Sequence, residues 1–314
     1  MASYSVRDYL SAETSETAYR ATDARLMPTR PGAFTSRVTR IEFEQLWVNC
    51  VMETGARLKQ LVTRPDRVHV GFVVQSGVPM IIDGSELRGN GLVRYPRHDE
   101  CFERSMGSIQ WCAVSMPVEA MLAAGAALTG HEVLSPARPI ITEAAPHAMQ
   151  KFKQLCAEAS ALAERGSGLL AIPATARSLE QALTSALVEC LAEPQATGQL
   201  PRHSARMIVD RFQRVIEANP DQALYLPEVC AAIRVSERTL RQSCQKLLGM
   251  SPARYLLLRR MHLAHRSLRA AKPGTTNVTE VATKFGFWHF GRFATTYRSL
   301  FGEIPSATLN RRPD

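Results

Sequence analysis

Apolar residues in the last hundred positions recur with a helical period, and they do so twice. In each copy, a stripe at i, i+3, i+4 and i+7 precedes one at i, i+4, i+7 and i+8, a pattern typical of two short helices. The first copy consists of Leu226, Val229, Cys230 and Ile233, then Leu240, Cys244, Leu247 and Leu248. The second, 52 to 53 residues later, consists of Val278, Val281, Ala282 and Phe285, then Phe293, Tyr297, Leu300 and Phe301. This internal repeat predicts two helix–turn–helix pairs.

Local signals mark the ends of these helices. Ser236 stands where it can cap the second helix of the first copy, and Asn277 and Glu280 have the spacing of a capping box before the second copy. Between the copies, residues 252–271 predict one long helix that Pro273 ends.

The earlier part of the chain has a different pattern. Residues 1–35 are polar and turn-rich, which predicts a flexible N-terminal segment. The chain then shows short β-like runs, clearest at 68–74, 78–82 and 108–116, followed by an alanine-rich helix from Pro117 to Gly130 and helices at about 146–165 and 175–192. The order predicts an α+β fold class, with a β-rich domain and trailing helices over 36–192, a linker over 193–204 and an all-α domain over 205–312.

The positive charge of the chain is concentrated in its last third. The formal net charge is +9 overall, and residues 201–314 alone carry +11, with 19 Lys and Arg against 8 Asp and Glu. Residues 1–200 carry −2, with 19 basic and 21 acidic residues. Such asymmetry favours a polyanionic partner for the C-terminal region, and together with the helix–turn–helix pattern it indicates double-stranded DNA.

Cysteine spacing and hydropathy argue against a metal-binding, membrane or secreted protein. The seven cysteines are scattered without a Cys-x-x-Cys pair, which predicts reduced, mostly buried thiols and no metal site. No apolar run reaches the ~18 residues of a membrane helix, and the N-terminus lacks the apolar core of a signal peptide. We therefore expect a cytoplasmic protein with no membrane partner and no cofactor.

The outward face of the second helix in copy one has the chemistry of base recognition. With Leu240 facing inward, Arg238, Arg241 and Gln242 point away from the core, and these side chains can pair with guanine and adenine edges. The alternative is a solvated face, but such a face usually mixes acids with bases, and here Glu237 is the only acid. We therefore expect base contacts from this group. We expect backbone or flanking contacts from Ser236 and Gln245.

The equivalent face of copy two is smaller in side-chain volume. We expect Thr295 to contact a base, and we expect flanking or phosphate contacts from His289, Gly291, Arg292 and Arg298. Copy one should then carry more of the sequence specificity, and copy two more of the positioning. The aromatic residues on the apolar stripes should pack in the core, whereas the pattern leaves Trp288 and Phe290, in the turn, unassigned.

These residues resemble the AraC/XylS family of bacterial transcriptional regulators. Residues 286–309, GFWHFGRFATTYRSLFGEIPSATL, resemble the family signature and its XylS-like branch in particular, and residues 226–268 resemble the first motif and linking helix. The resemblance covers about 205–312. It implies seven helices with two DNA-reading motifs, asymmetric promoter sites, recruitment of RNA polymerase and, most often, activation.

For residues 36–190 the resemblance is weaker. Many family members carry a cupin-like β-barrel there that senses a small molecule, and trailing helices that form a homodimer. A pocket for an unknown inducer would use residues such as Trp47, His69, Arg94 or His98, although each is more commonly structural. The helices at 146–192 offer leucines for a dimer seam, but these leucines serve equally well for packing on their own barrel.

Two other function classes compete with a regulator. In one, the N-terminal domain is an enzyme or an interaction module, with the basic region as a DNA tether. No glycine-rich phosphate loop, metal triad or nucleophile elbow supports the enzyme, so we expect none. In the other, the protein compacts DNA without sequence preference. The neutral N-terminal domain and the arginine–glutamine face argue against it.

Overall fold

The computed structural model describes residues 2–19, 22–192, 195–196, 203–219, 222–272 and 274–311. The chain forms two compact units. One contains Met1–Leu26 and Phe34–Leu200, and is called the β unit below. The other contains Met27–Ala33 and Pro201–Asp314, and is called the helical unit.

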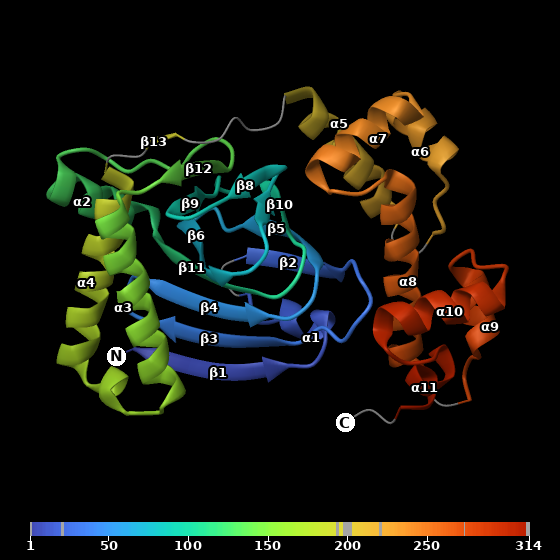
Figure 1. Cartoon of the computed structure of the whole chain (residues 1–314), viewed down its shortest axis with the longest axis horizontal. Helices are drawn as coiled ribbons and strands as arrows, with labels where there is room; N and C mark the ends of the chain where they lie inside the picture. Colours follow the sequence, from blue (N-terminus) through green and yellow to red (C-terminus); the bar gives the residue numbers. More distant parts are fainter. Residues whose placement is uncertain are drawn as a thin grey trace. The chain divides into compact units, whose positions relative to one another are not determined.

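Two antiparallel sheets form the body of the β unit (Figure 1). The larger sheet has the spatial order β1 (Ser3–Tyr9), β3 (Ser36–Glu42), β4 (Trp47–Glu53), β11 (Ile109–Pro117), β6 (Arg67–Ser76), β9 (Gly91–Arg94), β12 (Ile140–Glu143) and β13 (Gln195–Ala196). The smaller sheet has the order β2 (Thr22–Pro28), β5 (Arg57–Thr63), β10 (Glu100–Ser105), β7 (Met80–Ile82) and β8 (Ser85–Leu87).

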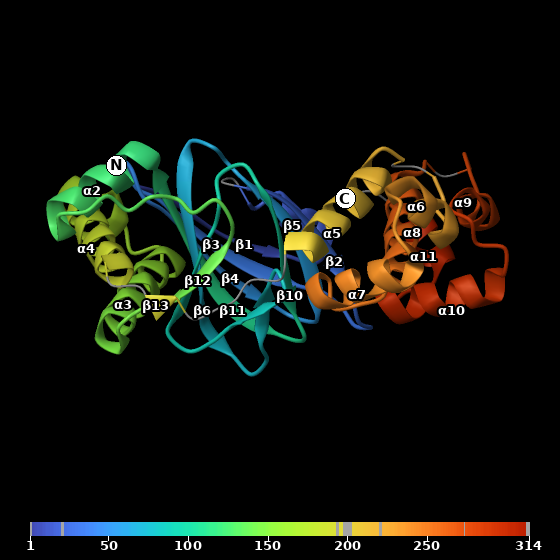
Figure 2. The same ribbon diagram turned by 90° about the horizontal axis from the view of Figure 1, so that it is seen from above.

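Alternation along the strands gives the larger sheet two buried faces. On β11, Trp111 points into a core shared with the smaller sheet, whereas its neighbour Cys112 points into a core shared with the helices. Figures 1 and 2 show those helices along one side of the sheet. They are α2 (Val118–Thr129), α3 (Pro146–Glu164), the short helix η1 (Leu169–Ala171) and α4 (Pro173–Ala192). The β-rich domain with trailing helices is therefore confirmed.

The leucines of the predicted helices at 146–192 pack inside the β unit. Leu183 and Leu187 are fully buried in the core between α3, α4 and the larger sheet. The other three, Leu155, Leu162 and Leu179, are partly buried against the same core. These leucines therefore pack on their own sheet, as one of the two alternatives predicts.

The N-terminal segment is ordered, contrary to expectation. Residues 1–35 contain β1, α1 (Ala12–Glu16) and β2. β1 pairs with β3 over its whole length, from Ser3 opposite Glu42 to Tyr9 opposite Ser36. It lies at the edge of the sheet, where polar side chains are common, so its stability comes from backbone hydrogen bonds that composition does not reveal. Of the predicted linker 193–204, only Gln195–Ala196 and the start of the next helix lie within the described residues.

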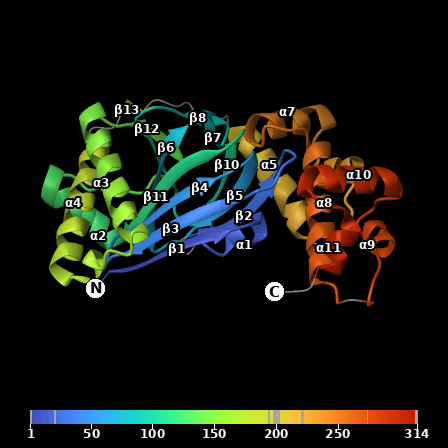
Figure 3. The same cartoon turned by 60° about the horizontal axis from the view of Figure 1, so that its bottom comes forward.

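The helical unit consists, within the described residues, of seven helices. These are α5 (His203–Glu217), α6 (Leu226–Ile233), α7 (Glu237–Leu247), α8 (Pro252–Ala270), α9 (Val278–Lys284), α10 (Phe290–Phe301) and α11 (Pro305–Asn310). α5, α6 and α7 contact one another, as do α9, α10 and α11, and α8 contacts both sets. Figure 3 shows α9, α10 and α11 beside α8. The predicted repeat of two helical pairs on either side of a long helix is confirmed.

One disulfide corrects the expectation of reduced thiols throughout. Cys50 on β4 stands directly opposite Cys112 on β11, and the two form a disulfide with their Cα atoms 4.2 Å apart. They are 62 residues apart in the chain, so only the strand pairing brings them together. The remaining five cysteines are free thiols, four of them buried.

Candidate nucleic-acid interface

The first helix–turn–helix pair is fixed by a tight turn and a cap. α6 ends at Arg234, whose backbone adopts the left-handed region at φ 55°. Ser236 then caps α7, its hydroxyl accepting a hydrogen bond from the Thr239 amide at 3.2 Å. Leu240 and Cys244 are buried on the inner side of α7 and set its rotation. The Ser236 hydroxyl is thus engaged as the cap of α7, and any contact of this residue with DNA stays a prediction.

That rotation exposes the predicted reading residues together. Arg238, Arg241, Gln242 and Gln245 are all exposed on α7. Arg241 forms an ion pair with Glu237, one helical turn earlier, and both side chains are more than half exposed. An exposed ion pair contributes about 0–1 kcal/mol, whereas a bidentate arginine–guanine contact contributes about 1–3 kcal/mol. Glu237 can therefore orient Arg241 without holding it back from a base.

The second pair has its own cap and its own turn glycine. The Asn277 side chain caps α9 by accepting a hydrogen bond from the Glu280 amide, and the Glu280 carboxylate accepts one from the Asn277 amide. The two bonds complete the predicted capping box. In the turn, Gly286 adopts φ +75°. A Cβ there would lie 2.8 Å from the Cβ of Ala223. Only glycine fits this turn without displacing its neighbours.

α10 exposes the smaller face that the sequence predicts. Gly291, Arg292, Thr295 and Arg298 are exposed, and His289 precedes the helix as its N-cap residue. The Thr295 hydroxyl donates a hydrogen bond to the Gly291 carbonyl at 2.9 Å. Its proton is engaged within the helix, so a base contact by Thr295 would use its methyl group or its oxygen as acceptor.

The aromatic residues of the second copy separate into two groups. Phe285, Phe293 and Tyr297 are buried in a core with α8, as the stripes predict. Trp288 is 67% exposed and Phe290 is 42% exposed, so neither of these unassigned residues belongs to the core. Because Trp288 lies one residue before the N-cap of α10, its ring is a further candidate for contact with DNA.

The β unit does not bring the four candidate ligand residues together. His69 is buried and lines a cavity of about 30 Å³ between the sheets, whereas the other three lie elsewhere. The ring of Trp47 is covered by the Arg67 guanidinium at 3.8 Å, and Arg94 donates a hydrogen bond to the Leu134 carbonyl. His98 is exposed in a turn at φ 54°.

A cluster of buried charged side chains lies at the cavity, and the sequence pattern did not predict it. It comprises Glu53, Arg57, Lys59 and Glu103, all at most 3% exposed. The Arg57 Nε lies 2.8 Å from Glu53 Oε2, and Lys59 pairs with Glu103. Lys59, Glu103 and His69 line the cavity, as does Asn49. The buried Nε2 of His69 and Oδ1 of Asn49 have no hydrogen-bond partner, which marks the cavity as a polar site.

Burial gives His69 a pH-dependent effect on stability. Burial and the neighbouring Arg67 lower the pKa of His69 from 6.5 to about 4. Between pH 4 and pH 6.5 the unfolded chain binds this proton more readily than the folded chain does. The contribution of His69 to the free energy of unfolding is therefore fully present above pH 6.5 and is lost as the pH falls. From pH 7 to pH 5 this group should cost the wild type about 2 kcal/mol of unfolding free energy. Urea unfolding of wild type and His69→Gln at both pH values measures the difference. An equal pH dependence in the two proteins would contradict the expectation.

The described part of the chain contains neither a membrane-spanning helix nor a cluster of metal-binding side chains. None of the helices in the described part of the chain combines the length and apolarity needed to cross a bilayer. Those residues also hold no group of three or more His, Cys, Asp or Glu side chains placed to bind a metal ion.

Comparison with known proteins finds this chain similar to regulatory proteins. A helix-turn-helix domain family matches residues 229–311. The chain is 34% identical over 147 residues to the probable thc operon regulatory protein of Rhodococcus erythropolis. This alignment covers 44% of each of the two chains. It is 37% identical over 103 residues to XylDLEGF operon transcriptional activator 3 of Pseudomonas putida, covering 33% of this chain and 31% of the relative. The chain thus aligns with less than half of the length of either relative.

Among solved structures, the chain is similar to a probable AraC family transcriptional regulator from Rhodopseudomonas palustris CGA009. The two are 36% identical, with 34% of this chain and 99% of that chain covered and a TM-score of 0.31.

Proposed function

We propose that this chain is a sequence-specific transcriptional regulator of the AraC/XylS type that binds promoter DNA, because residues 229–311 match a helix-turn-helix domain family and the chain is similar to operon regulators. The observation that carries the proposal is the paired exposure of α7 and α10, each the second helix of a helix–turn–helix pair. Both present arginine, and neither exposes an acid other than Glu237 on its outer face.

The length of α8 supports simultaneous use of the two reading helices. With 19 residues, α8 extends about 28 Å at 1.5 Å per residue. Successive major-groove segments on one face of DNA are roughly 34 Å apart. The length of α8, which connects the two helix sets, is thus close to the length of one DNA turn. α7 and α10 would therefore enter adjacent major-groove segments of one asymmetric site.

We assign the roles by chemistry. Arg238, Arg241 and Gln242 read bases through α7, and Thr295 contacts a base from α10. The flanking and phosphate contacts come from Ser236, Gln245, His289, Gly291, Arg292 and Arg298. In this scheme the protein acts in the cytoplasm, most simply as an activator that recruits RNA polymerase, and forms a homodimer through a surface other than the buried leucines of α3 and α4.

The β unit is proposed to sense a small polar molecule at the cavity near His69. The unpartnered polar atoms of His69 and Asn49 and the neighbouring Lys59 and Glu103 would supply its hydrogen bonds. A cavity of about 30 Å³ has room for one or two waters, so a larger ligand must displace side chains as it enters.

Capture of genomic DNA tests the proposed function. Purified full-length protein is incubated with sheared genomic DNA at near-physiological salt, and the retained fragments are sequenced. We expect one recurring asymmetric motif with two boxes about ten base pairs apart. Retention without any shared motif, repeated with the region 201–314 alone, would contradict a sequence-specific regulator.

A further inference from the structure

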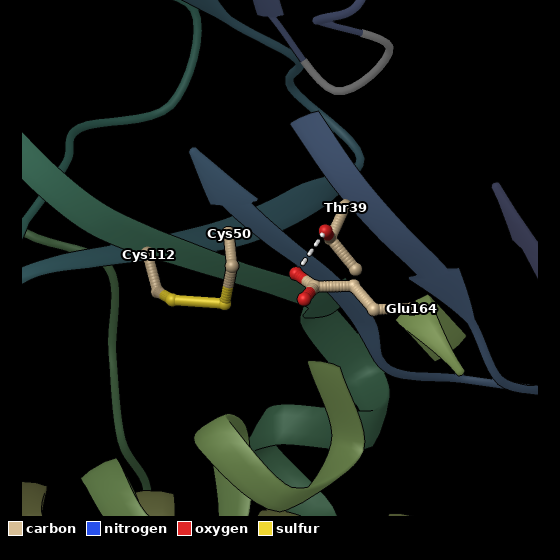
Figure 4. The surroundings of a disulfide bond; sticks show 4 residues. All are labelled: Thr39, Cys50, Cys112 and Glu164. Atoms are coloured by element: carbon tan, nitrogen blue, oxygen red, sulfur yellow. Dashed lines mark hydrogen bonds between the residues drawn. A yellow bond between two sulfur atoms is a disulfide. The ribbon is translucent and has the colours of Figure 1, made fainter. Parts of the chain in front are cut away.

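The Cys50–Cys112 disulfide lies at the contact between the larger sheet and α3. Its two cysteines are cross-strand neighbours on β4 and β11, and their side chains face the helices (Figure 4). The Cα separation of 4.2 Å is that of a non-hydrogen-bonded antiparallel pair, in which side chains approach most closely. Each sulfur is therefore held beside the other by the sheet, whether or not the bond is formed.

A cavity of about 150 Å³ adjoins this disulfide. Both cysteines line it, together with Ala157, Ser160, Ala161 and Glu164 of α3. Its lining also includes Arg37 and Met52, whose side chains are about half exposed to solvent. The disulfide thus has free space next to it, and Cys50 keeps 8% of its surface exposed to solvent, against 2% for Cys112.

The other cysteines of the β unit lack this access. Burial raises the pKa of the Cys190 thiol to about 12, with a contribution from Glu189, and raises that of Cys156 further still. Cys101 is completely buried. The Cys156 and Cys190 thiols therefore do not readily form the thiolate that exchange requires.

We propose that Cys50 and Cys112 form a thiol–disulfide exchange site, whose reaction partner is a dithiol and whose reduction loosens the packing of α3 on the larger sheet. The proposal goes beyond DNA binding but rests on it in one respect. A DNA-binding regulator works in a reducing compartment, where disulfides are rare and, when present, are usually transient and redox-sensing.

The exchange balances as a two-electron reduction of the protein. A thiolate of the dithiol attacks the Sγ of Cys50, the more exposed of the pair, and forms a mixed disulfide. The Cys50–Cys112 bond breaks, and Cys112 leaves as a thiolate that takes up a proton. The second thiol of the reagent, after losing its proton, then attacks the reagent sulfur that is bonded to Cys50. Cys50 leaves as a thiolate and takes up a proton. The dithiol ends as a cyclic disulfide, and the protein holds two thiols.

Reduction changes the contact between sheet and helix. Two unbonded sulfurs need about 3.5–4 Å between them, and the neighbouring cavity accepts the displaced thiol. At the same cavity the Thr39 hydroxyl donates a hydrogen bond to Glu164 at 2.9 Å, joining β3 to the end of α3 (Figure 4). A shift of the cysteine side chains would therefore act on the last turns of α3, a helix that packs against α4.

The test combines thiol mapping with amide hydrogen exchange on the full-length protein. The protein is treated with dithiothreitol without denaturant, and new thiols are alkylated and located by mass spectrometry. We expect labelling at Cys50 and Cys112 but not at Cys156 or Cys190. Amide exchange over 157–164 should become about tenfold faster in the reduced form, as expected for a local opening of lower free energy.

Variants separate exchange from simple structural support. Cys50→Ser with Cys112→Ser should show the faster α3 exchange without reductant, and Cys230→Ser, which keeps the pair, should behave as wild type. The wild-type comparison stands even where the double variant fails to fold. A pair that is reduced only after unfolding, or equal α3 exchange in both forms, would overturn the proposal. DNA capture with each form tests the proposed function separately: absence of specific binding in both contradicts that function alone.

Discussion

Replacing Arg238 with alanine is expected to weaken binding to the preferred DNA sequence by about 5- to 150-fold, which corresponds to the loss of about 1–3 kcal/mol. Arg238 is exposed on the first turn of α7, on the face opposite the buried Leu240. A guanidinium there can pair with both acceptors on the major-groove edge of guanine. Removing it should therefore also relax the choice of base at one position. Fluorescence anisotropy with the captured site and its single-base variants measures both effects.

Arg292→Ala is the matched comparison for this experiment. Arg292 is also an exposed arginine in the first turn of a proposed reading helix, but on α10, where we expect a phosphate contact. Its loss should weaken binding to all sequences alike and reduce the salt dependence by about one ion. If Arg238→Ala changed affinity without changing base preference, α7 would have only a positioning role.

The helical unit was largely predictable because its information is local. The stripe of Phe293, Tyr297 and Leu300 fixes which side of α10 is buried, so the exposed side follows from the helical period alone. Caps add to this, since the Asn277–Glu280 box is readable three residues apart. The unassigned Trp288 shows the limit: turn residues have no period, and only the structure places its ring outside the core.

The β unit was less predictable because its information is non-local. Cys50 and Cys112 are brought together by the pairing of β4 with β11, which no spacing in the sequence signals. β1 reads as a polar segment because it is an edge strand held by backbone hydrogen bonds. Of four residues proposed for a pocket by type, only His69 reaches the cavity, since residue type does not encode which face of a strand is enclosed.

The charge cluster illustrates the same limit most clearly. In the stretch RLKQLVT of β5, Arg57 and Lys59 look like the outward positions of a half-exposed strand. They point instead between the sheets, where Glu53 and Glu103 balance their charge. Glu103 comes from a different strand, β10, that pairs with β5. The burial of such charges depends on partners that only the folded sheet supplies.

Arg57→Met is expected to destabilise the β unit by about 3–5 kcal/mol, the usual cost of removing one partner from a buried ion pair. Arg57 is fully buried, with its Nε 2.8 Å from Glu53 and its Nη2 3.6 Å from Glu103. Burial alone would raise the pKa of Glu53, but the attraction of Arg57 and Lys59 outweighs it and keeps that pKa below its ordinary value. Urea unfolding followed by tryptophan fluorescence, to which the buried Trp111 contributes, measures the loss.

Charge balance distinguishes this cost from the loss of packing. In Arg57→Met the cluster keeps two carboxylates and one ammonium, so one carboxyl pKa should rise above its unfolded value. A raised pKa favours the folded state at low pH, and the deficit relative to wild type should narrow as the pH falls from 7 towards 5. Adding Glu53→Gln restores neutrality and should recover part of the stability, as a double-mutant cycle would measure. A loss of unfolding free energy that is independent of pH and unchanged by Glu53→Gln would contradict this account. Arg57 would then act through its volume alone. Glu53 would be stabilised chiefly by the hydrogen bonds that it accepts from Tyr19 and Trp111.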